Sequence, residues 1–168
     1  MRRKSLLLIF ILVFVLFMCV LFAPYQKKIN VTVTGYCADL IDTKDRFAAQ
    51  VSVQGVASYH FFSLKEFSGI ITINDTLHLQ KSHPVYIQFG NGLGQINCYE
   101  EGAQLSQYKY YGYLCTYDFT KLLLLFYDEN NAVKHHRYFV GPVEYIEKTA
   151  SLAKQLSEGT PLADINWE

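Results

Sequence analysis

The chain opens with a basic tripeptide and a long apolar run, and this pattern constrains everything that follows it. Arg2, Arg3 and Lys4 precede the segment 6–23, which holds 18 residues and no charge. A helix needs roughly 20 predominantly apolar residues to cross a bilayer. We therefore expect residues 1–23 to form a transmembrane helix and the rest of the chain to be a domain held at a membrane.

Two other interpretations of this segment fit less well. A cleaved signal peptide has an apolar stretch of about 7–15 residues and a small-x-small cleavage site. The run here is longer. A cut after Ala23 would have Leu21 and Phe22 just before it and Pro24 just after it, which makes a poor site for signal peptidase. A lipoprotein would use Cys19, but Met18 precedes it where a small residue is expected. We therefore adopt an uncleaved signal anchor.

The basic residues around the apolar run also predict its orientation. Three basic side chains and the α-amino group precede the run, whereas two basic side chains, Lys27 and Lys28, follow it. Basic flanks favour the cytoplasmic side of a membrane. We therefore expect a single-pass protein of the cell membrane, with a cytoplasmic N-terminus and an extracytoplasmic domain.

Size and charge limit what the domain can be. The 145 residues after Ala23 are enough for one ordinary domain with its own hydrophobic core. Without the three N-terminal basic residues, 12 basic and 15 acidic residues remain, so the domain is slightly acidic. Nucleic-acid binding rests on clustered Lys and Arg side chains that neutralise phosphates. The sequence has no such cluster after the membrane flank, which excludes a nucleic-acid partner.

Most of the domain shows the alternation of apolar and polar residues that is typical of half-buried strands. The segments 29–36 and 67–73 are two strong examples. Asn91-Gly92 favours a tight hairpin turn. The continuous apolar run 122–127 indicates a strand that is covered on both faces. Short turns between consecutive strands predict a mainly β fold, an antiparallel meander shaped as an open barrel or a curved sheet.

After the strands, the apolar period changes to three or four residues, which predicts a C-terminal helix over 142–158. Pro142 suits the first helical position, and Gly159 with Pro161 provides a stop. The apolar stripe of this helix needs a partner, and the strand at 122–127 is the natural one. The expected organisation is an anchor (1–23), a connector (24–30), a β-rich extracytoplasmic domain that includes the helix (31–159), and a loose tail (160–168).

The sequence offers no motif for catalysis. It contains neither a G-x-S-x-G elbow nor a C-x-x-C pair. The glycines at 90, 92 and 94 precede an expected strand, whereas a dinucleotide site needs a helix there. The acid pairs at 100–101 and 128–129 lie in expected turns, where charged side chains are normally solvated. We therefore predict a non-enzymatic protein without a cofactor.

The five histidines do not form a metal-binding pattern. His78 and His83 lack a recognisable third and fourth ligand. His135 and His136 are adjacent, so in a strand their side chains point to opposite faces. His60 lies among aromatic residues, where packing is the simplest role. We expect no metal site.

Three cysteines lie in the domain, and two interpretations of them remain open. Cys98 and Cys115 occur in consecutive expected strands, which makes them the preferred pair for a disulfide outside the membrane. Alternatively, both of them and Cys37 are small buried apolar residues.

Tyrosine is the least ordinary feature of the domain. The chain has 13 tyrosines, and five of them fall between positions 108 and 117. In an extended strand, Tyr111, Tyr113 and Tyr117 share one face. An exposed row of tyrosines offers apolar area together with hydroxyl groups, which suits a sugar, a peptide or a protein partner. These three are the candidate binding residues; the alternative is structural packing, because aromatic residues favour strands.

The layout of a basic start, one apolar helix and a β-rich outer domain, with segments such as Phe67-Ser-Gly-Ile-Ile-Thr-Ile73 and Tyr117-Asp-Phe119, resembles small single-pass membrane-anchored proteins of Gram-positive bacteria. The resemblance implies no particular activity. We expect a membrane-tethered extracytoplasmic binding module whose partner is a protein or an envelope component. Two alternatives are an accessory or immunity-type protein acting on a neighbouring membrane protein, and an unrecognised hydrolase of envelope polymers.

Overall fold

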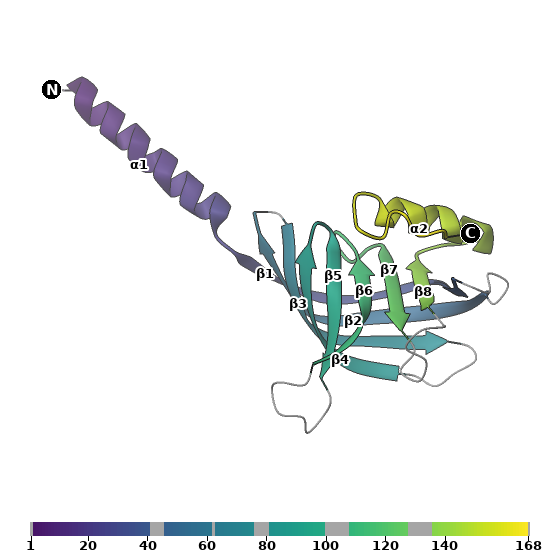
Figure 1. Ribbon diagram of the computed structural model, residues 1–168. Helices are drawn as coiled ribbons and strands as arrows, with labels where there is room; N and C mark the ends of the chain where they lie inside the picture. The colour runs from purple at the N-terminus through teal and green to yellow at the C-terminus, as the bar shows by residue number, and fades with distance from the viewer. Residues whose placement is uncertain are drawn as a thin grey trace.

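An eight-stranded barrel forms most of the structure, which is a computed structural model (Figure 1). The structure describes residues 2–40, 46–61, 63–75, 81–99, 108–127 and 136–167. The strands of this part of the chain are β1 (Tyr25–Asp39), β2 (Arg46–His60), β3 (Ser63–Asp75), β4 (Lys81–Gly90), β5 (Leu93–Tyr99), β6 (Tyr108–Cys115), β7 (Leu122–Tyr127) and β8 (His136–Gly141). Each strand pairs antiparallel with the next, and β8 pairs with β1. The expected antiparallel meander is confirmed, and it closes into a barrel.

The barrel closes where β8 runs beside the second half of β1. Tyr36 lies opposite Val140 in this ladder. A Cβ atom on Gly35 would overlap the carbonyl oxygen of Val140, so glycine lets the two backbones approach each other. Pairing between the first and the last strand is non-local. Local sequence patterns therefore predict the meander but do not distinguish a closed barrel from an open barrel or a curved sheet.

The first strand begins earlier than its sequence pattern indicates. We expected 24–30 to be a connector, but β1 starts at Tyr25 and pairs with β2 from that residue onward. The early part of β1 is exposed and polar, including Lys27 and Lys28, and therefore lacks the alternation that marks a half-buried strand. Only two residues, Ala23 and Pro24, separate the strand from the preceding helix.

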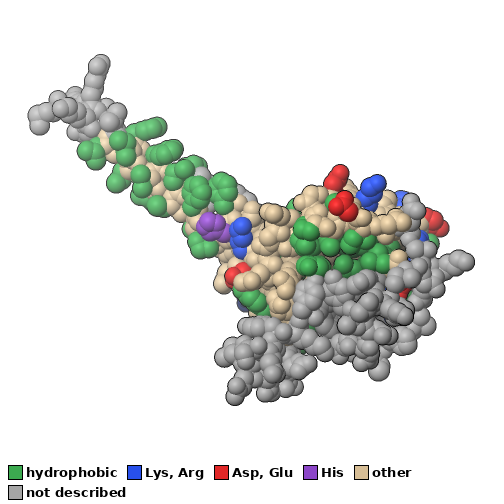
Figure 2. Space-filling model, viewed as in Figure 1, with side chains coloured by type: hydrophobic (Ala, Val, Ile, Leu, Met, Phe, Trp, Pro, Cys, Tyr) green, Lys and Arg blue, Asp and Glu red, His purple; other side chains and the backbone are tan. Residues whose placement is uncertain are grey.

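The N-terminal helix, α1 (Arg2–Phe22), projects away from the barrel (Figure 1). Its described side chains are apolar, and each one over 8–17 is more than half exposed. Figure 2 shows these hydrophobic side chains along the length of the helix. Among the residues that the structure describes, no helix combines the length and the apolar character that a membrane crossing requires.

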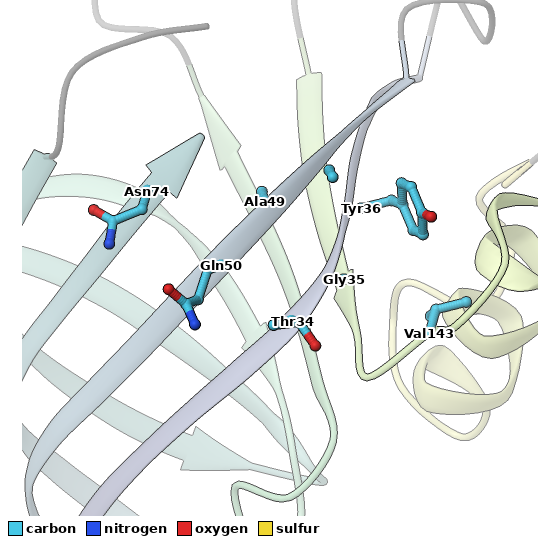
Figure 3. Close-up of a pocket in the computed structure, with 8 residues that line it drawn as sticks. Thr34, Gly35, Tyr36, Ala49, Gln50, Asn74 and Val143 are labelled. Atoms are coloured by element: carbon cyan, nitrogen blue, oxygen red, sulfur yellow. The ribbon is translucent and has the colours of Figure 1, made fainter. Parts of the chain in front are cut away.

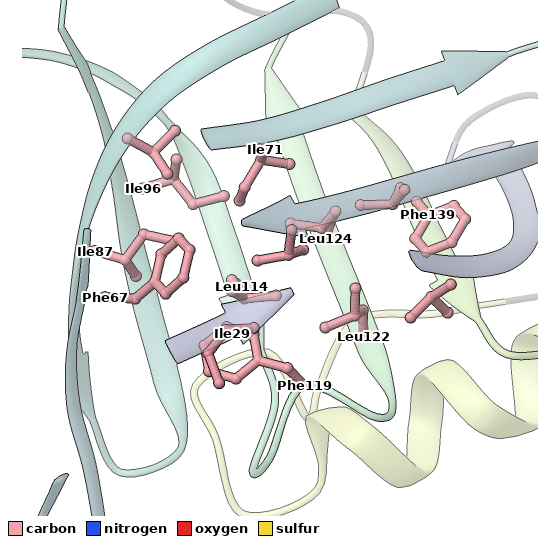
Figure 4. Close-up of a cluster of buried hydrophobic side chains, with 14 of the residues drawn as sticks. Ile29, Phe67, Ile71, Ile87, Ile96, Leu114, Phe119, Leu122, Leu124 and Phe139 are labelled. Atoms are coloured by element: carbon pink, nitrogen blue, oxygen red, sulfur yellow. The ribbon is translucent and has the colours of Figure 1, made fainter. Parts of the chain in front are cut away.

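Apolar side chains fill the interior of the barrel (Figure 4). Alternate residues of each strand point inward, as period-two alternation requires. The largest inward-facing side chains that are fully buried are Phe67, Ile87, Leu114, Phe119, Leu122, Leu124 and Phe139. An eight-stranded barrel is just wide enough for side chains to fill its interior. The described side chains inside this barrel therefore form a packed apolar core.

Phe119 plugs the end of the barrel that lies near α1. It belongs to the β6–β7 loop, has φ of 65°, and its ring centroid lies 5.2 Å from that of Phe67. Thr116 holds this loop in place: its hydroxyl accepts a hydrogen bond from the N–H of Phe119 at 2.9 Å and donates one to the carbonyl oxygen of Lys121 at 2.9 Å. The loop therefore places an aromatic side chain inside the barrel.

The C-terminal part of the chain covers the outside of the barrel over β7 and β8. It contains the short 3₁₀ helix η1 (Ile146–Lys148) and the helix α2 (Thr149–Ser157), which lies against these strands (Figure 1). Ala153 and Leu156 of α2 pack with Leu123 and Leu125, the outward-facing residues of β7. The prediction that the strand at 122–127 is covered on both faces is confirmed.

The boundaries of the C-terminal elements differ from the expected ones. We predicted a helix over 142–158, but α2 begins at Thr149, and Tyr145 before it has an extended backbone. The residues after β8 must first cross from the rim of the barrel to its outer face. The expected loose tail instead packs tightly: Leu162 and Trp167 are buried in the cluster between α2 and the barrel.

Candidate functional site

Two adjoining depressions lie on the outer face of the barrel and share Thr34 and Val143. The first has a volume of about 500 Å³ and is formed by β1, β2 and β3 together with Val143 (Figure 3). The second has a volume of about 670 Å³ and lies between the barrel and α2, with Leu152 and Lys148 among its lining residues. Because they share residues, we treat them as one site and call it the lateral groove.

The floor of the lateral groove is a row of three uncharged polar side chains. Thr34 of β1 is the register partner of Gln50 of β2, and Gln50 is the partner of Asn74 of β3. Directly opposed residues on one face of a sheet have Cβ atoms about 4.5–5.5 Å apart. All three side chains are exposed. The barrel register thus aligns one hydroxyl group and two amide groups across three strands.

These three side chains retain their hydrogen-bonding capacity. Within the described part of the chain, no side-chain hydrogen bond joins Thr34, Gln50 or Asn74 to another residue. One step along the same two strands, Thr32 and Ser52 hydrogen bond to each other, with 3.0 Å between their hydroxyl oxygens. A hydroxyl group and two amides together offer several donors and acceptors. The row can therefore bind a ligand that carries neutral donors and acceptors.

The side of the groove next to α2 is more mixed in character. Lys121, Glu144 and Lys148 bring charge, whereas Leu152 brings apolar surface. The ammonium group of Lys148 lies 5.5 Å from the centre of the Tyr145 ring, a cation–π distance. The groove therefore has an uncharged half over β1–β3 and a charged half along α2.

The lining of the groove does not indicate bond-breaking chemistry. Among the described residues that line the two depressions, there is no histidine or cysteine. In the part of the chain that the structure describes, no group of three His, Cys, Asp or Glu side chains is placed to hold a metal ion.

The three tyrosines predicted from the sequence do not line the groove. Tyr113 faces outward and is partly buried in the cluster beneath α2. Tyr117 lies in the loop after β6 and is 67% exposed. The side chain of Tyr111 lies outside the described residues. A role for these residues in ligand binding stays a prediction.

A β-bulge interrupts the alternation on which the tyrosine row was based. Ile96 pairs with Gly112, but Asn97 pairs with Tyr110, so Tyr111 is an extra residue in β6. Gly112 has φ of 151°, a conformation that side chains with a Cβ rarely adopt. A bulge changes which face the preceding residues occupy. The two-residue period of β6 is therefore interrupted at Tyr111.

The disulfide predicted between Cys98 and Cys115 is not formed. Cys98 faces the barrel interior, whereas Cys115 faces α2 on the outside. In the ladder between β5 and β6, Cys115 lies opposite Leu93 and Cys98 lies opposite Lys109. Five residues along a strand correspond to about 17 Å, whereas a disulfide needs Cα atoms within about 7 Å. The alternative that the thiols are buried apolar residues agrees with the structure, since Cys37 is buried as well.

Other candidates from the sequence are only partly described. His60 is exposed at the end of β2. His83 lies in β4 and His136 in β8, but the structure does not describe their side chains. His78 and His135 lie outside the described residues. The acid pairs at 100–101 and 128–129 also lie outside the described residues.

The fold and the groove define an up-and-down barrel with a packed interior and a candidate binding site on its outer wall. Comparisons with protein-family models, with curated proteins and with solved structures find no match for this chain. Its function must therefore be inferred from its own residues.

Proposed function

We propose that the protein is a membrane-tethered, extracytoplasmic binding module whose lateral groove takes an uncharged, hydroxyl-rich ligand such as a saccharide segment of an envelope polymer. The observation that carries this proposal is the row of Thr34, Gln50 and Asn74. Amide and hydroxyl groups pair well with sugar hydroxyl groups because both sides donate and accept. Tyr36, at the edge of the same depression, offers a ring on which the apolar face of a sugar can rest.

The tether in this proposal is the full apolar run 6–23 of the sequence. Its support is that the described side chains over 8–17 are exposed on every side of α1. A helix that is apolar all round is stable when it is buried in a core or in lipid. The basic flank of Arg2, Arg3 and Lys4 supports a cytoplasmic N-terminus and an extracytoplasmic barrel.

Ligand binding is tested with the full chain in lipid nanodiscs on an array of neutral and charged oligosaccharides. We expect neutral oligosaccharides to bind, and Gln50→Ala combined with Asn74→Ala to weaken binding about tenfold, because two neutral hydrogen bonds are lost. Gln88→Ala with Gln95→Ala is the matched control, since these exposed glutamines are register partners outside the groove. Failure of every sugar to bind, or equal losses in both double variants, contradicts the proposal. Copurification of one membrane protein in detergent would favour the accessory-protein alternative instead.

The topology is tested separately with an engineered thiol. Gln54 is exposed on the outer face of β2, so Gln54→Cys presents a thiol that the buried native cysteines of the barrel do not. We expect a membrane-impermeant maleimide to label this variant in intact cells. Labelling only after lysis would place the barrel in the cytoplasm and contradict the proposed location. The unsubstituted chain is the control for labelling of the native thiols.

A further inference from the structure

The connection between α1 and the barrel is too short to separate them. Ala23 and Pro24 alone join Phe22, the last residue of the helix, to Tyr25, the first residue of β1. The three steps along the chain from Phe22 to Tyr25 span at most about 11 Å. The headgroup layer on each side of a bilayer is about 5–8 Å thick. If α1 crosses a membrane, as the proposed function requires, the near end of the barrel lies within the lipid headgroups or directly against them.

Aromatic side chains are concentrated at this end of the barrel. Phe61, in the β2–β3 turn, stacks on Phe22 with ring centroids 4.7 Å apart and an interplanar angle of 8°. Tyr25 stacks on Tyr59 at 5.1 Å and 7°. Phe22, Tyr25 and Phe61 nevertheless remain 43%, 47% and 51% exposed. Large aromatic rings that are exposed beside a membrane helix are typical of the membrane–water interface.

The backbone of the β2–β3 turn holds Phe61 in this exposed position. Its φ is 50°, in the left-handed region that residues other than glycine seldom adopt. The turn therefore places an aromatic residue where glycine, asparagine or aspartate is the usual choice. Contact between the ring and lipid would explain why an exposed phenylalanine occupies this position.

Basic side chains accompany the aromatic ones. Lys27, Lys28 and Lys65 are exposed near the same end, and Figure 2 shows basic and histidine side chains where α1 meets the barrel. Lys65 is the extra residue of a bulge, because Ser58 pairs with Glu66 while Tyr59 pairs with Leu64. A bulge re-aims a side chain. Among the described residues near this end, Glu66 and Asp118 are acidic, so the three lysines outnumber them.

We infer that this end of the barrel docks on the membrane surface through a collar formed by Phe22, Tyr25, Phe61, Lys27 and Lys65. The inference rests on the proposed membrane tether. The aromatic rings lie among the headgroups, and the lysines contact anionic lipids. The docked barrel presents the lateral groove sideways, since the strands that form the groove run away from the collar.

Tryptophan reporters in lipid vesicles test the collar. The full chain, with Phe61→Trp or Tyr25→Trp, is reconstituted in phosphatidylcholine–phosphatidylglycerol vesicles with or without brominated acyl chains, which quench nearby tryptophans. We expect severalfold stronger quenching of either reporter than of Ile70→Trp, an exposed position on the wall of the barrel. The native Trp167 is buried against Tyr138 and provides the background in every variant. Equal quenching at positions 25, 61 and 70 would overturn the inference.

Two further measurements separate the failure of the tether from the failure of the collar. If the unsubstituted chain does not float with the vesicles in a density gradient, the membrane tether and the collar are both wrong. If the chain floats with the vesicles but Phe61→Trp and Tyr25→Trp are quenched no more than Ile70→Trp, the collar alone is wrong. The charge component is tested with Lys27→Gln combined with Lys65→Gln. If the lysines contact anionic lipid, phosphatidylglycerol should increase the quenching of the Phe61→Trp reporter, and the double lysine substitution should remove that increase. An increase that persists in the double variant contradicts a contribution from the lysines.

Discussion

The hydroxyl group of Tyr138 donates a hydrogen bond of 3.4 Å to the carbonyl oxygen of Trp167, and the two rings meet edge to face with centroids 5.2 Å apart. The indole N–H of Trp167 also donates to the hydroxyl oxygen of Ser157 at 3.1 Å. Trp167 therefore joins the end of the chain to both β8 and α2. The Trp167 ring thus belongs to the buried apolar cluster between α2 and the outer face of the barrel.

Removal of the Trp167 side chain should destabilise the whole barrel. We expect Trp167→Ala to lower the free energy of unfolding by about 3–5 kcal/mol, the usual cost of deleting a buried aromatic ring. The measurement is urea unfolding followed by circular dichroism. Asn166→Ala is the control, because Asn166 is exposed and should change stability by less than about 0.5 kcal/mol. A loss for Trp167→Ala as small as the one expected for Asn166→Ala would mean that the tail does not support the barrel.

A glycine pair between β2 and β3 makes room for an interior ring. Gly55 and Gly69 are register partners, and a Cβ atom on either would lie 2.8 Å from Cζ of Phe67 and would overlap the opposite backbone. We expect Gly69→Ala to lower the free energy of unfolding by about 1–3 kcal/mol, the typical cost of overpacking. Gly90→Ala is the matched control, since its Cβ would meet no atom within 4 Å. Equal melting temperatures for the two variants would contradict this close packing.

Local sequence patterns predict much of this fold because most of its contacts join neighbouring strands. Asn91 and Gly92 form the expected turn, with φ values of 52° and 78°. The apolar run 122–127 is covered on both faces as predicted. Closure of the barrel depends on pairing between β1 and β8, which no local pattern encodes. The packing of Trp167 is likewise a contact between distant residues.

The candidate site was harder to predict than the fold. Thr34, Gln50 and Asn74 are ordinary outward-facing residues in three separate strands, and only the register places them in one row. The connecting segments help to set that register, but the register itself cannot be read from the sequence. The predicted tyrosine row assumes a strict two-residue period along β6, and the bulge at Tyr111 interrupts that period, so the row stays a prediction. The only local signal for that bulge was Gly112, because glycine in a strand often marks one.

Alkaline pH should destabilise the protein through Cys115. Burial raises the pKa of the Cys115 thiol from 9.0 to about 12, and a hydrogen bond with Thr160 opposes this only in part. Between pH 9 and about 12, the unfolded chain loses this proton while the folded chain retains it, so stability falls as pH rises. Stability below pH 9 should not depend on this group.

This pH dependence is measured by urea unfolding at a series of alkaline pH values. We expect Cys115→Ala to flatten the decline above pH 9, relative to the unsubstituted chain. Some decline should remain, because burial also raises the pKa of Tyr138 above its ordinary value of 10.0. Identical pH profiles for the two proteins would contradict a buried, protonated thiol at position 115.

Substitution of Tyr113 should destabilise the protein, whereas substitution of Tyr117 should leave its stability almost unchanged. Tyr113 packs against the apolar cluster beneath α2, so Tyr113→Ala should lower the free energy of unfolding by about 2–4 kcal/mol. Tyr117 is 67% exposed, so Tyr117→Ala should change it by less than about 0.5 kcal/mol. Thermal unfolding of the two variants, with binding of the array oligosaccharides measured on the same samples, separates packing from recognition. Weaker binding by Tyr117→Ala at unchanged stability would support the original tyrosine hypothesis. Unchanged binding by Tyr117→Ala, together with a destabilised Tyr113→Ala, would assign the tyrosines to structure and leave recognition to the lateral groove.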